Sequence, residues 1–278
     1  ILLYSSSFES HLADLQRVFS RLADAGLRLG PTKCSFAMDK CIFLGHEISS
    51  KGLCPPSDRL KALMDYPAPK TQKEVRRLWG LLNWFRKYIP NLSAIAKPIT
   101  LLLKSDTDFH WQEEQDLCLQ EIKQLLAKSP MLAFPRFDID FRLAVDSSSQ
   151  GIGYMLYQVH PESEFPPGTS EKDRTRIVRF VSKSLQKWQK KYGPTKLELL
   201  GVTSSILDCA SYLRGQRFKV YCDHQALKPL FQKKLKGAIY ERWLALLQQF
   251  NFDIEYKPAA QMVVVDALSK CDLPPNSD

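Results

Sequence analysis

Four acidic residues lie inside or directly after apolar stretches, where an ionised side chain is costly unless it is paired or bound to a metal. Asp146 and Asp223 each follow a short apolar run, and Glu198 and Asp266 each lie within one. If the two runs form adjacent strands, the two aspartates lie side by side. Each acid taken alone is better explained as a strand-end residue that caps a turn, or as a residue that faces the dipole at a helix start, than as a metal ligand. Four acids on one domain repel one another, and a divalent cation removes that repulsion.

The type of ligand indicates the metal and the reaction. Oxygen ligands in a chain with only five histidines favour Mg²⁺ or Mn²⁺. Two such ions in one site support in-line displacement at phosphorus, because one activates water and the other stabilises the leaving oxygen. The acids therefore predict metal-dependent hydrolysis of a phosphodiester.

Strands and helices alternate around these acids. Residues 160–175, which hold three prolines, are expected to form a long surface loop. The order of the elements needs crossover connections, which predicts a mixed sheet of the α/β class. The expected strands are 141–145, 151–159, 176–181, 218–222 and 252–256, and the expected helices are 197–213, 225–232, 239–250 and 263–269.

The first half of the chain is mainly helical by its periodicity. Thr71 and Glu74 have the spacing of a capping box, and Pro90 should end the helix that they begin. In the helix expected over 112–128 we expect Leu117, Ile122, Leu125 and Leu126 to face inward. The expected helices are 8–25, a short one from Ser57 to before Pro67, 71–89, 92–103 with a kink at Pro98, and 112–128, and short strands are expected at 27–36 and 41–48.

The charge distribution favours a polyanionic partner. The net charge is +9, and the basic residues gather in two runs. Residues 69–104 hold eight basic side chains against one acid, and residues 183–197 hold five lysines and no acid. A single run of this kind is explained equally by a solvated surface, but two runs beside an acid cluster favour nucleic acid.

Other features exclude several classes of protein. No stretch approaches the roughly 20 apolar residues of a membrane helix, so no membrane partner is expected. The seven cysteines are scattered without a Cys-x-x-Cys pair, which argues against a zinc site or a disulfide framework and favours a reducing compartment. The chain begins without Met inside an apolar run, so we expect it to be part of a longer protein.

Several motifs resemble one family in its own order. VDSSSQGIGYMLYQ, TKLELLGV, VYCDHQALKPLF and VVDALSK resemble the RNase H domain of gypsy-class LTR-retrotransposon reverse transcriptases. Upstream, CIFLGHEISSKGL resembles the end of the polymerase palm, and GLLNWFRKYIPNLSAIAKPIT resembles the thumb. The resemblance covers about residues 1–271.

The resemblance implies an RNase H-like mixed five-stranded sheet with flanking helices, preceded by a small α-helical thumb and a palm fragment. The expected divisions are a palm end at 1–54, a thumb at 55–108, a tether at 109–140, an RNase H-like domain at 141–271 and a tail at 272–278. The Asp-Asp pair of the polymerase site is absent, so this fragment should not polymerise DNA.

The family's metal ligands correspond to Asp146, Glu198, Asp223 and Asp266, which would hold two Mg²⁺ or Mn²⁺ ions. By this resemblance Asp146 bridges both ions, Glu198 and Asp223 hold the ion near the leaving 3′-oxygen, and Asp266 holds the ion that activates water. Some members carry a mobile His before the last helix, but residues 257–265 contain none, and His224 is interpreted as structural. The expected nucleic-acid contacts are Phe43 and Gly45 of a primer grip, Lys73, Arg76, Arg77, Arg86 and Lys87 of the thumb, and Lys183, Lys187, Lys190 and Lys191.

The predicted function is therefore cleavage of the RNA strand of an RNA/DNA hybrid. The alternatives are a truncated RNA-directed DNA polymerase fragment and a domesticated remnant that binds nucleic acid without cutting, and the four intact acids favour the nuclease. The expected partners are RNA/DNA hybrid, template-primer, the rest of the reverse transcriptase and a neighbouring integrase. The expected location is intracellular, in a cytoplasmic particle or the nucleus.

Overall fold

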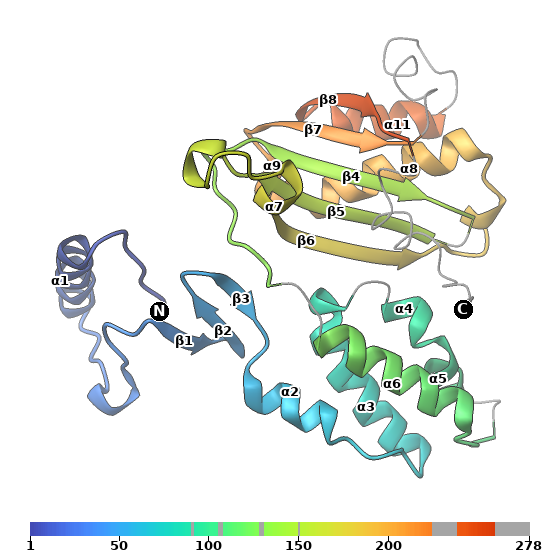
Figure 1. Ribbon diagram of the computed structural model, residues 1–278, viewed down its shortest axis with the longest axis horizontal. Helices are drawn as coiled ribbons and strands as arrows, with labels where there is room; N and C mark the ends of the chain where they lie inside the picture. Colours follow the sequence, from blue (N-terminus) through green and yellow to red (C-terminus); the bar gives the residue numbers. More distant parts are fainter. Residues whose placement is uncertain (90–91, 105–107, 128–130, 150, 224–237, 259–278) are drawn as a thin grey trace. The chain divides into compact units, whose positions relative to one another are not determined.

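The computed structural model describes the chain except residues 90–91, 105–107, 128–130, 150, 224–237 and 259–278 (Figure 1). The chain divides into two compact units, Ile1–Pro56 and Ser57–Asp278. None of the helices in the described part is long and apolar enough to cross a membrane.

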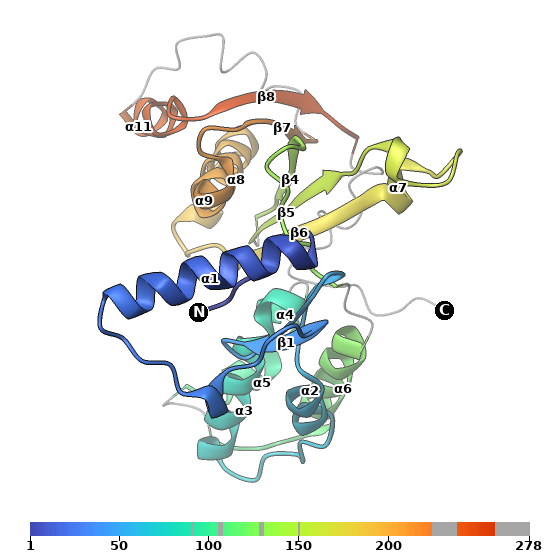
Figure 2. The ribbon, with the colours of Figure 1, turned by 90° about the vertical axis from the view of Figure 1, so that its left-hand side faces the viewer.

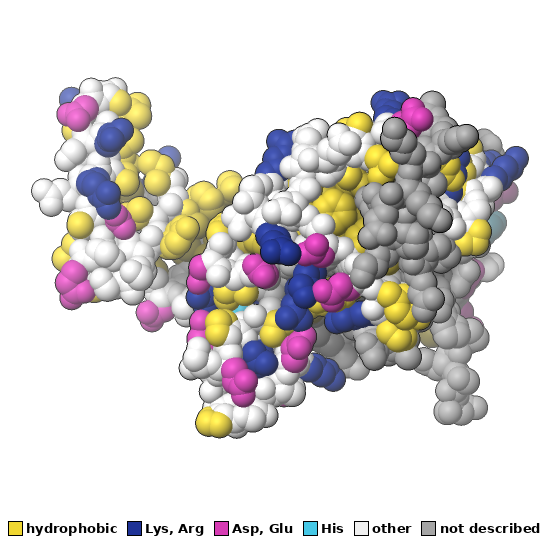
Figure 3. All heavy atoms as spheres, turned by 90° about the horizontal axis from the view of Figure 1, so that it is seen from above, with side chains coloured by type: hydrophobic (Ala, Val, Ile, Leu, Met, Phe, Trp, Pro, Cys, Tyr) yellow, Lys and Arg dark blue, Asp and Glu magenta, His cyan; other side chains and the backbone are white. Residues whose placement is uncertain are grey.

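The first unit contains a long helix and a small sheet. Helix α1 (Phe8–Asp24) is capped by Ser7, and none of its residues is buried. Strands β1 (Lys40–Phe43), β2 (His46–Ser49) and β3 (Gly52–Cys54) form an antiparallel sheet in the order β1-β2-β3. Hydrophobic side chains remain on the surface of this unit (Figure 3).

Two strand predictions for this unit were wrong. Residues 27–36 contain no strand but a 3₁₀ turn, η1 (Pro31–Lys33), because a proline has no N–H to donate to a sheet. Residues 41–48 are not one strand but most of the β1–β2 hairpin. Leu44 and Gly45 form its turn with φ angles of 50° and 81°, which is the left-handed region that tight hairpin turns require.

The second unit begins with a group of helices. Thr71 caps helix α3 (Gln72–Trp84) by accepting a hydrogen bond from Glu74 N at 3.3 Å. In the predicted capping box the Glu74 carboxylate would accept a hydrogen bond from Thr71 N, but here it accepts one from Lys70 N at 2.7 Å instead. The elements are α2 (Ser57–Met64), α3 (Gln72–Trp84), η2 (Phe85–Tyr88), α4 (Leu92–Ile95), α5 (Lys97–Leu101) and α6 (Glu113–Ala127).

The helices pack around a shared apolar core. The side chains of Leu78, Phe85, Ile99 and Ile122 are fully buried in it. The helix predicted over 92–103 is two short helices, with Pro98 in the first turn of α5. Leu117 was predicted to face inward but is 59% exposed, because α6 turns Cys118 and Leu119 to the core instead.

The remaining described chain forms a five-stranded mixed sheet in the order β6-β5-β4-β7-β8. Its central strand β4 pairs antiparallel with β5 and parallel with β7. Figure 2 shows α8, α9 and α11 on one face of this sheet and α7 on the other side. The elements are β4 (Phe141–Ser147), β5 (Gly151–Val159), α7 (Glu171–Arg174), β6 (Thr175–Ser184), α8 (Pro194–Asp208), α9 (Ala210–Leu213), β7 (Arg217–Cys222), α11 (Ala238–Leu247) and β8 (Asn251–Tyr256).

The sheet buries alternate residues of its strands against α8. Leu143, Val145, Tyr154 and Val220 are fully buried in this core. The predicted mixed sheet is confirmed, and all five predicted strands are present. The predicted loop 160–175 is more ordered than expected, since it holds η3 (Glu162–Glu164) and α7. The helices predicted at 225–232 and 263–269 lie wholly outside the described residues.

Candidate metal centre

The two predicted aspartates meet because their strands are parallel neighbours. The β4–β7 pairing runs to Ala144 opposite Tyr221, and Asp146 and Asp223 each stand two residues further on. Side chains two residues apart on a strand share a face of the sheet. Asp146 is the sixth residue of β4, and Asp223 directly follows the end of β7.

Glu198 joins these two residues from helix α8. One carboxylate oxygen from each of Asp146, Glu198 and Asp223 lies within 4.8 Å of the others. Asp146 and Glu198 are buried, with 6% and 5% of their surface exposed, and Asp223 is half-buried. The sequence prediction that these three acids converge is confirmed. The fourth predicted ligand, Asp266, and His224 lie outside the described residues.

Burial and mutual repulsion act on Glu198. Removal from water raises the pKa of its carboxyl group to about 9, and the nearby charges of Asp146 and Asp223 contribute to the same shift. A hydrogen bond from the Ser147 backbone opposes the shift without cancelling it. A carboxyl group with this pKa holds a proton at neutral pH unless a bound cation replaces that proton.

The donor set fits a hard divalent cation. Three carboxylates converge, and Glu198 Oε2 is buried with no hydrogen-bond partner in the described part of the chain. Buried polar atoms of proteins almost always have a partner, so this oxygen has an unused bonding capacity. Carboxylate oxygens without histidine or cysteine ligands are typical of Mg²⁺, Mn²⁺ or Ca²⁺ sites.

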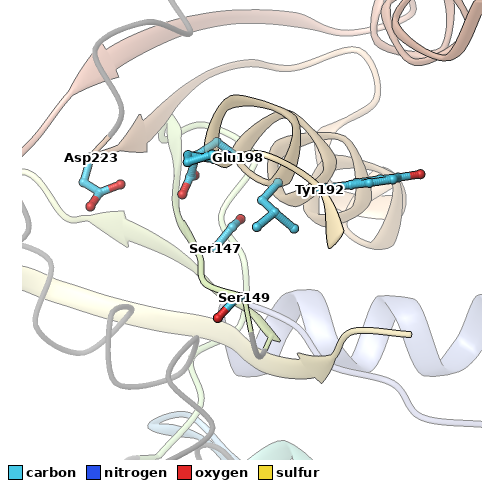
Figure 4. Close-up of a pocket in the computed structure, with 7 residues that line it drawn as sticks. Ser147, Ser149, Tyr192, Glu198 and Asp223 are labelled. Atoms are coloured by element: carbon cyan, nitrogen blue, oxygen red, sulfur yellow. The ribbon is translucent and has the colours of Figure 1, made fainter. Parts of the chain in front are cut away.

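Glu198 and Asp223, which converge with Asp146, line a pocket of about 400 Å³. In Figure 4 the Asp223 carboxyl group points toward Glu198, and the Tyr192 ring extends away from both acids. The pocket is lined by Ser147, Ser149, Tyr192, Pro194, Leu197, Glu198 and Asp223.

Helix α8 can approach β4 closely because residue 201 is a glycine. A Cβ atom built on Gly201 would overlap the Ser147 hydroxyl group and lie 3.3 Å from Val145 Cγ1. This close contact holds the α8 turn that carries Glu198 against the strand that carries Asp146. Sequence reasoning missed Gly201, although a glycine in the middle of an apolar helix was an available signal.

The predicted nucleic-acid contacts of the helical part lie on its surface. Lys73, Arg76, Arg77 and Arg86 are exposed, whereas Lys87 is half-buried and burial lowers its pKa. The Arg86 guanidinium lies 5.9 Å from the centre of the Trp79 ring. Among the neighbouring rings, Phe85 and Tyr88 are fully buried and Trp79 and Trp84 are half-buried.

The other predicted contacts are divided between the two units. Lys187, Lys190 and Lys191 are exposed on the segment between β6 and α8. Lys183 forms an ion pair with Asp208. In the first unit, half-buried Phe43 ends β1, and Gly45 occupies the hairpin turn.

Known proteins match this chain at three levels. Residues 136–250 match the model of the RNase H-like domain found in reverse transcriptase. The Retrovirus-related Pol polyprotein from transposon 297 of Drosophila melanogaster is 34% identical over 278 residues, which is 99% of this chain and 25% of that protein. The Transposon Tf2-3 polyprotein of Schizosaccharomyces pombe is 30% identical over 97% of this chain and 20% of its own length. The chain thus spans about a quarter or less of these relatives.

Solved structures show the same fold. The foamy viral protease-reverse transcriptase in complex with RNA/DNA hybrid matches with a TM-score of 0.73 and 22% identity, over 92% of this chain and 34% of its own. The same enzyme in complex with double-stranded DNA matches with a TM-score of 0.72 and 21% identity, over 92% of this chain and 52% of its own. The predicted RNase H-like fold is therefore confirmed.

Proposed function

We propose that this chain, which carries the RNase H-like domain of a retrotransposon Pol polyprotein, is an endoribonuclease that cuts the RNA strand of RNA/DNA hybrids. The observation that carries this proposal is the convergence of the Asp146, Glu198 and Asp223 carboxylates in that domain, beside a pocket that Glu198 and Asp223 line. The polyprotein is proposed to be of the gypsy class, as the sequence motifs indicated.

Asp146, Glu198 and Asp223 are the residues that would hold the catalytic cations, with Asp266 as the proposed fourth ligand. Two bound Mg²⁺ or Mn²⁺ ions would supply an activated water and stabilise charge on the leaving 3′-oxygen. Asp146 lies on the central strand and would help to hold both ions. Glu198 must release its proton to become a ligand, so cation binding at this site should release a proton.

The reaction consists of attack by a water oxygen on phosphorus and departure of the 3′-oxygen. It leaves a 5′-phosphate and a 3′-hydroxyl end. The chain's own contribution is positional, because β4, β7 and α8 fix the three carboxylates before substrate arrives.

Recognition of the hybrid would use both strands. Ribose 2′-hydroxyl groups distinguish RNA from DNA because they both donate and accept hydrogen bonds. We place the RNA strand at Asp146 and Glu198, and the phosphates of the DNA strand at the lysines of residues 183–196. The exposed Lys187, Lys190 and Lys191 suit this contact better than Lys183, which is engaged with Asp208.

The wider biological setting is part of the same proposal. The chain would act within a reverse transcriptase on template-primer, beside an integrase in the same polyprotein. A cytoplasmic particle or the nucleus would be its location. The relatives named above support the polyprotein context, since each is a transposon polyprotein several times longer than this chain.

A cleavage assay with three labelled substrates tests the proposal. RNA/DNA hybrid, duplex RNA and duplex DNA are incubated at equal concentration with saturating Mg²⁺ or Mn²⁺. We expect cutting of the RNA strand in the hybrid, weak or no cutting of duplex RNA, and none of duplex DNA. Equal cutting of duplex DNA and hybrid would instead indicate a general metal nuclease. Binding without cutting of any substrate would indicate a nucleic-acid-binding remnant.

A further inference from the structure

An exposed tryptophan lies among lysines next to the acid pocket. Trp188 is 57% exposed on the segment that joins β6 to α8. Lys187, Lys190 and Lys191 surround it in the sequence, and all three are exposed. We call these four residues the tryptophan–lysine patch. An indole presents more apolar surface than most other side chains, so its exposure at the centre of a cationic patch suggests a ligand with both flat apolar and anionic groups.

The patch has a defined geometry. Residues 189–191 form a 3₁₀ turn, and Gln189 closes it by accepting a hydrogen bond from Gln186 N at 2.9 Å through its side chain. Gln189 N in turn donates to Gln186 O at 2.9 Å. The Trp188 ring packs edge-on against Tyr192, with the ring centres 5.6 Å apart. The indole is therefore in contact with Tyr192, while more than half of the surface of Trp188 stays exposed.

Tyr192 connects the patch directly to the acid pocket. Tyr192 is one of the residues that line the pocket with Glu198, and its ring extends from there away from the acids (Figure 4). Its ring is also fixed from other sides, by Trp243 at 6.3 Å between ring centres and by Lys196, whose Nζ lies 3.7 Å from the ring centre. A strand that leaves the acid pocket across Tyr192 therefore meets Trp188 next.

The chemistry of the patch selects one class of ligand. An open indole face stacks on a nucleobase whose own face is free, and neighbouring ammonium groups contact the phosphates. Inside a duplex each base face is already covered by the next base pair, so a duplex offers the indole only sugars and groove edges. Unpaired nucleotides offer a free base face together with the phosphate charge.

We propose that the tryptophan–lysine patch binds the DNA strand of the hybrid where that strand continues beyond the acid pocket as an unpaired segment, with the indole stacking on its bases and the lysines contacting its phosphates. The preferred substrate is then a hybrid with a single-stranded extension rather than a blunt one. This inference rests on the proposed function where it places the hybrid at Asp146, Glu198 and Asp223. The contact with the extension itself needs no cleavage.

Fluorescence anisotropy in EDTA tests the contact separately from catalysis. The probes are a blunt labelled RNA/DNA hybrid and hybrids in which either strand carries an unpaired extension of about eight nucleotides, within the range of single-strand site sizes. The full chain should bind the hybrid with the extended DNA strand more tightly than the blunt one. Trp188→Ala should weaken that binding by about 5- to 150-fold, the usual range for loss of base–aromatic stacking. Binding of the blunt hybrid should change less than about twofold on the same scale.

Two further variants control the result. Trp188→Phe keeps an aromatic face and should retain a large part of the preference. Phe137→Ala removes an aromatic residue of similar exposure, 56%, from the segment before β4. Asp146 lies at the other end of that strand, so this variant should leave the affinities for both the blunt and the extended hybrid unchanged. Equal weakening of blunt and extended hybrids by Trp188→Ala would assign the residue to a duplex contact and overturn the proposal, as would no change at all. A Trp188-dependent preference in a chain that cuts nothing would support the patch and refute the proposed nuclease.

Discussion

Two helices of similar length, one from each unit, show how differently the two units of this chain are packed. Helix α1 has 17 residues and buries none of them, and its Leu12 remains 52% exposed. Helix α8 has 15 residues and buries eight, among them Glu198. The apolar residues of α1 lie along one face, whereas α8 is apolar around most of its circumference and packs against the sheet. An amphipathic pattern therefore predicts a helix, whereas burial depends on the surface that faces it.

The same packing creates the chemistry of the site. The β4–α8 contact removes Glu198 from water, and this removal is the main cause of its raised pKa. No comparable group of three or more metal-ligating side chains was found elsewhere in the described part of the chain. The acid site therefore depends on the packing of the sheet domain, so substitutions in this domain should have larger effects on cleavage and stability than substitutions in α1.

The largest expected effect is the loss of cleavage on replacing a ligand. Asp146→Asn keeps the size of the side chain but removes the charge that would hold a cation. Hybrid cleavage should fall by at least about 1,000-fold, beyond the roughly 10–100-fold typical of residues that only support ligands. Asp140→Asn, an exposed acid just before β4, is the matched control and should cut normally. Near-normal cleavage by Asp146→Asn would refute the ligand assignment.

Leucine truncations compare the packing of the two regions directly. Leu143 is fully buried in β4, so Leu143→Ala should lower the free energy of unfolding by about 2–5 kcal/mol. Leu12→Ala in α1 should change it by about 0.5 kcal/mol or less. Urea unfolding followed by circular dichroism measures both values. Equal losses would show that α1 is covered in solution and would break the comparison.

The carboxyl group of Glu198 should make stability depend on pH. In the folded chain it keeps its proton up to a pKa of about 9, whereas the unfolded chain releases it near 4.5. Unfolding thus releases a proton between these values, so this contribution to stability is fully present below pH 4.5 and is lost as the pH rises toward 9. Urea unfolding in EDTA at pH 5 and pH 9 should show a smaller decrease for Glu198→Gln than for the unchanged chain. Equal decreases would contradict the raised pKa.

Glycine substitutions probe the close contact between α8 and β4. Gly201→Ala places a methyl group where the Ser147 hydroxyl lies, and should cost about 1–3 kcal/mol of stability as well as cleavage activity. Adding Ser147→Ala should recover part of the loss. Gly80→Ala, at an exposed position of α3 with open space around it, should instead stabilise the chain by up to about 1 kcal/mol. Thermal unfolding of the three variants distinguishes these outcomes.

The sequence predicted the sheet and its acids well because their signals are local. Asp146 and Asp223 end apolar runs, and the order of strands and helices allows few arrangements in which these ends do not meet. The family motifs around Glu198 added the third acid of the cluster. Each of these features can be recognised within about ten residues of sequence.

The features that were missed depend on contacts between distant residues. Leu117 fits the helical pattern of α6, but the choice between Leu117 and Leu119 is made by the surface that α6 meets. The close approach of Gly201 to Ser147 joins two separate elements, α8 and β4. Periodicity carries no information about such contacts, so only the folded chain shows them.

The smallest expected effect concerns a single exposed arginine of the helical part. If Arg77 contacts a phosphate, a variant without the Arg77 charge should release one counterion fewer when it binds the hybrid. Arg77→Gln should therefore make the log–log slope of hybrid affinity against salt less negative by about 0.7–0.9. Lys172→Gln, an exposed lysine outside both basic runs, is the control and should leave the slope unchanged. Fluorescence anisotropy at several salt concentrations measures both slopes. If neither variant alters the slope, Arg77 belongs to a solvated surface, and the sheet domain carries more of the electrostatic contact than the helices before it.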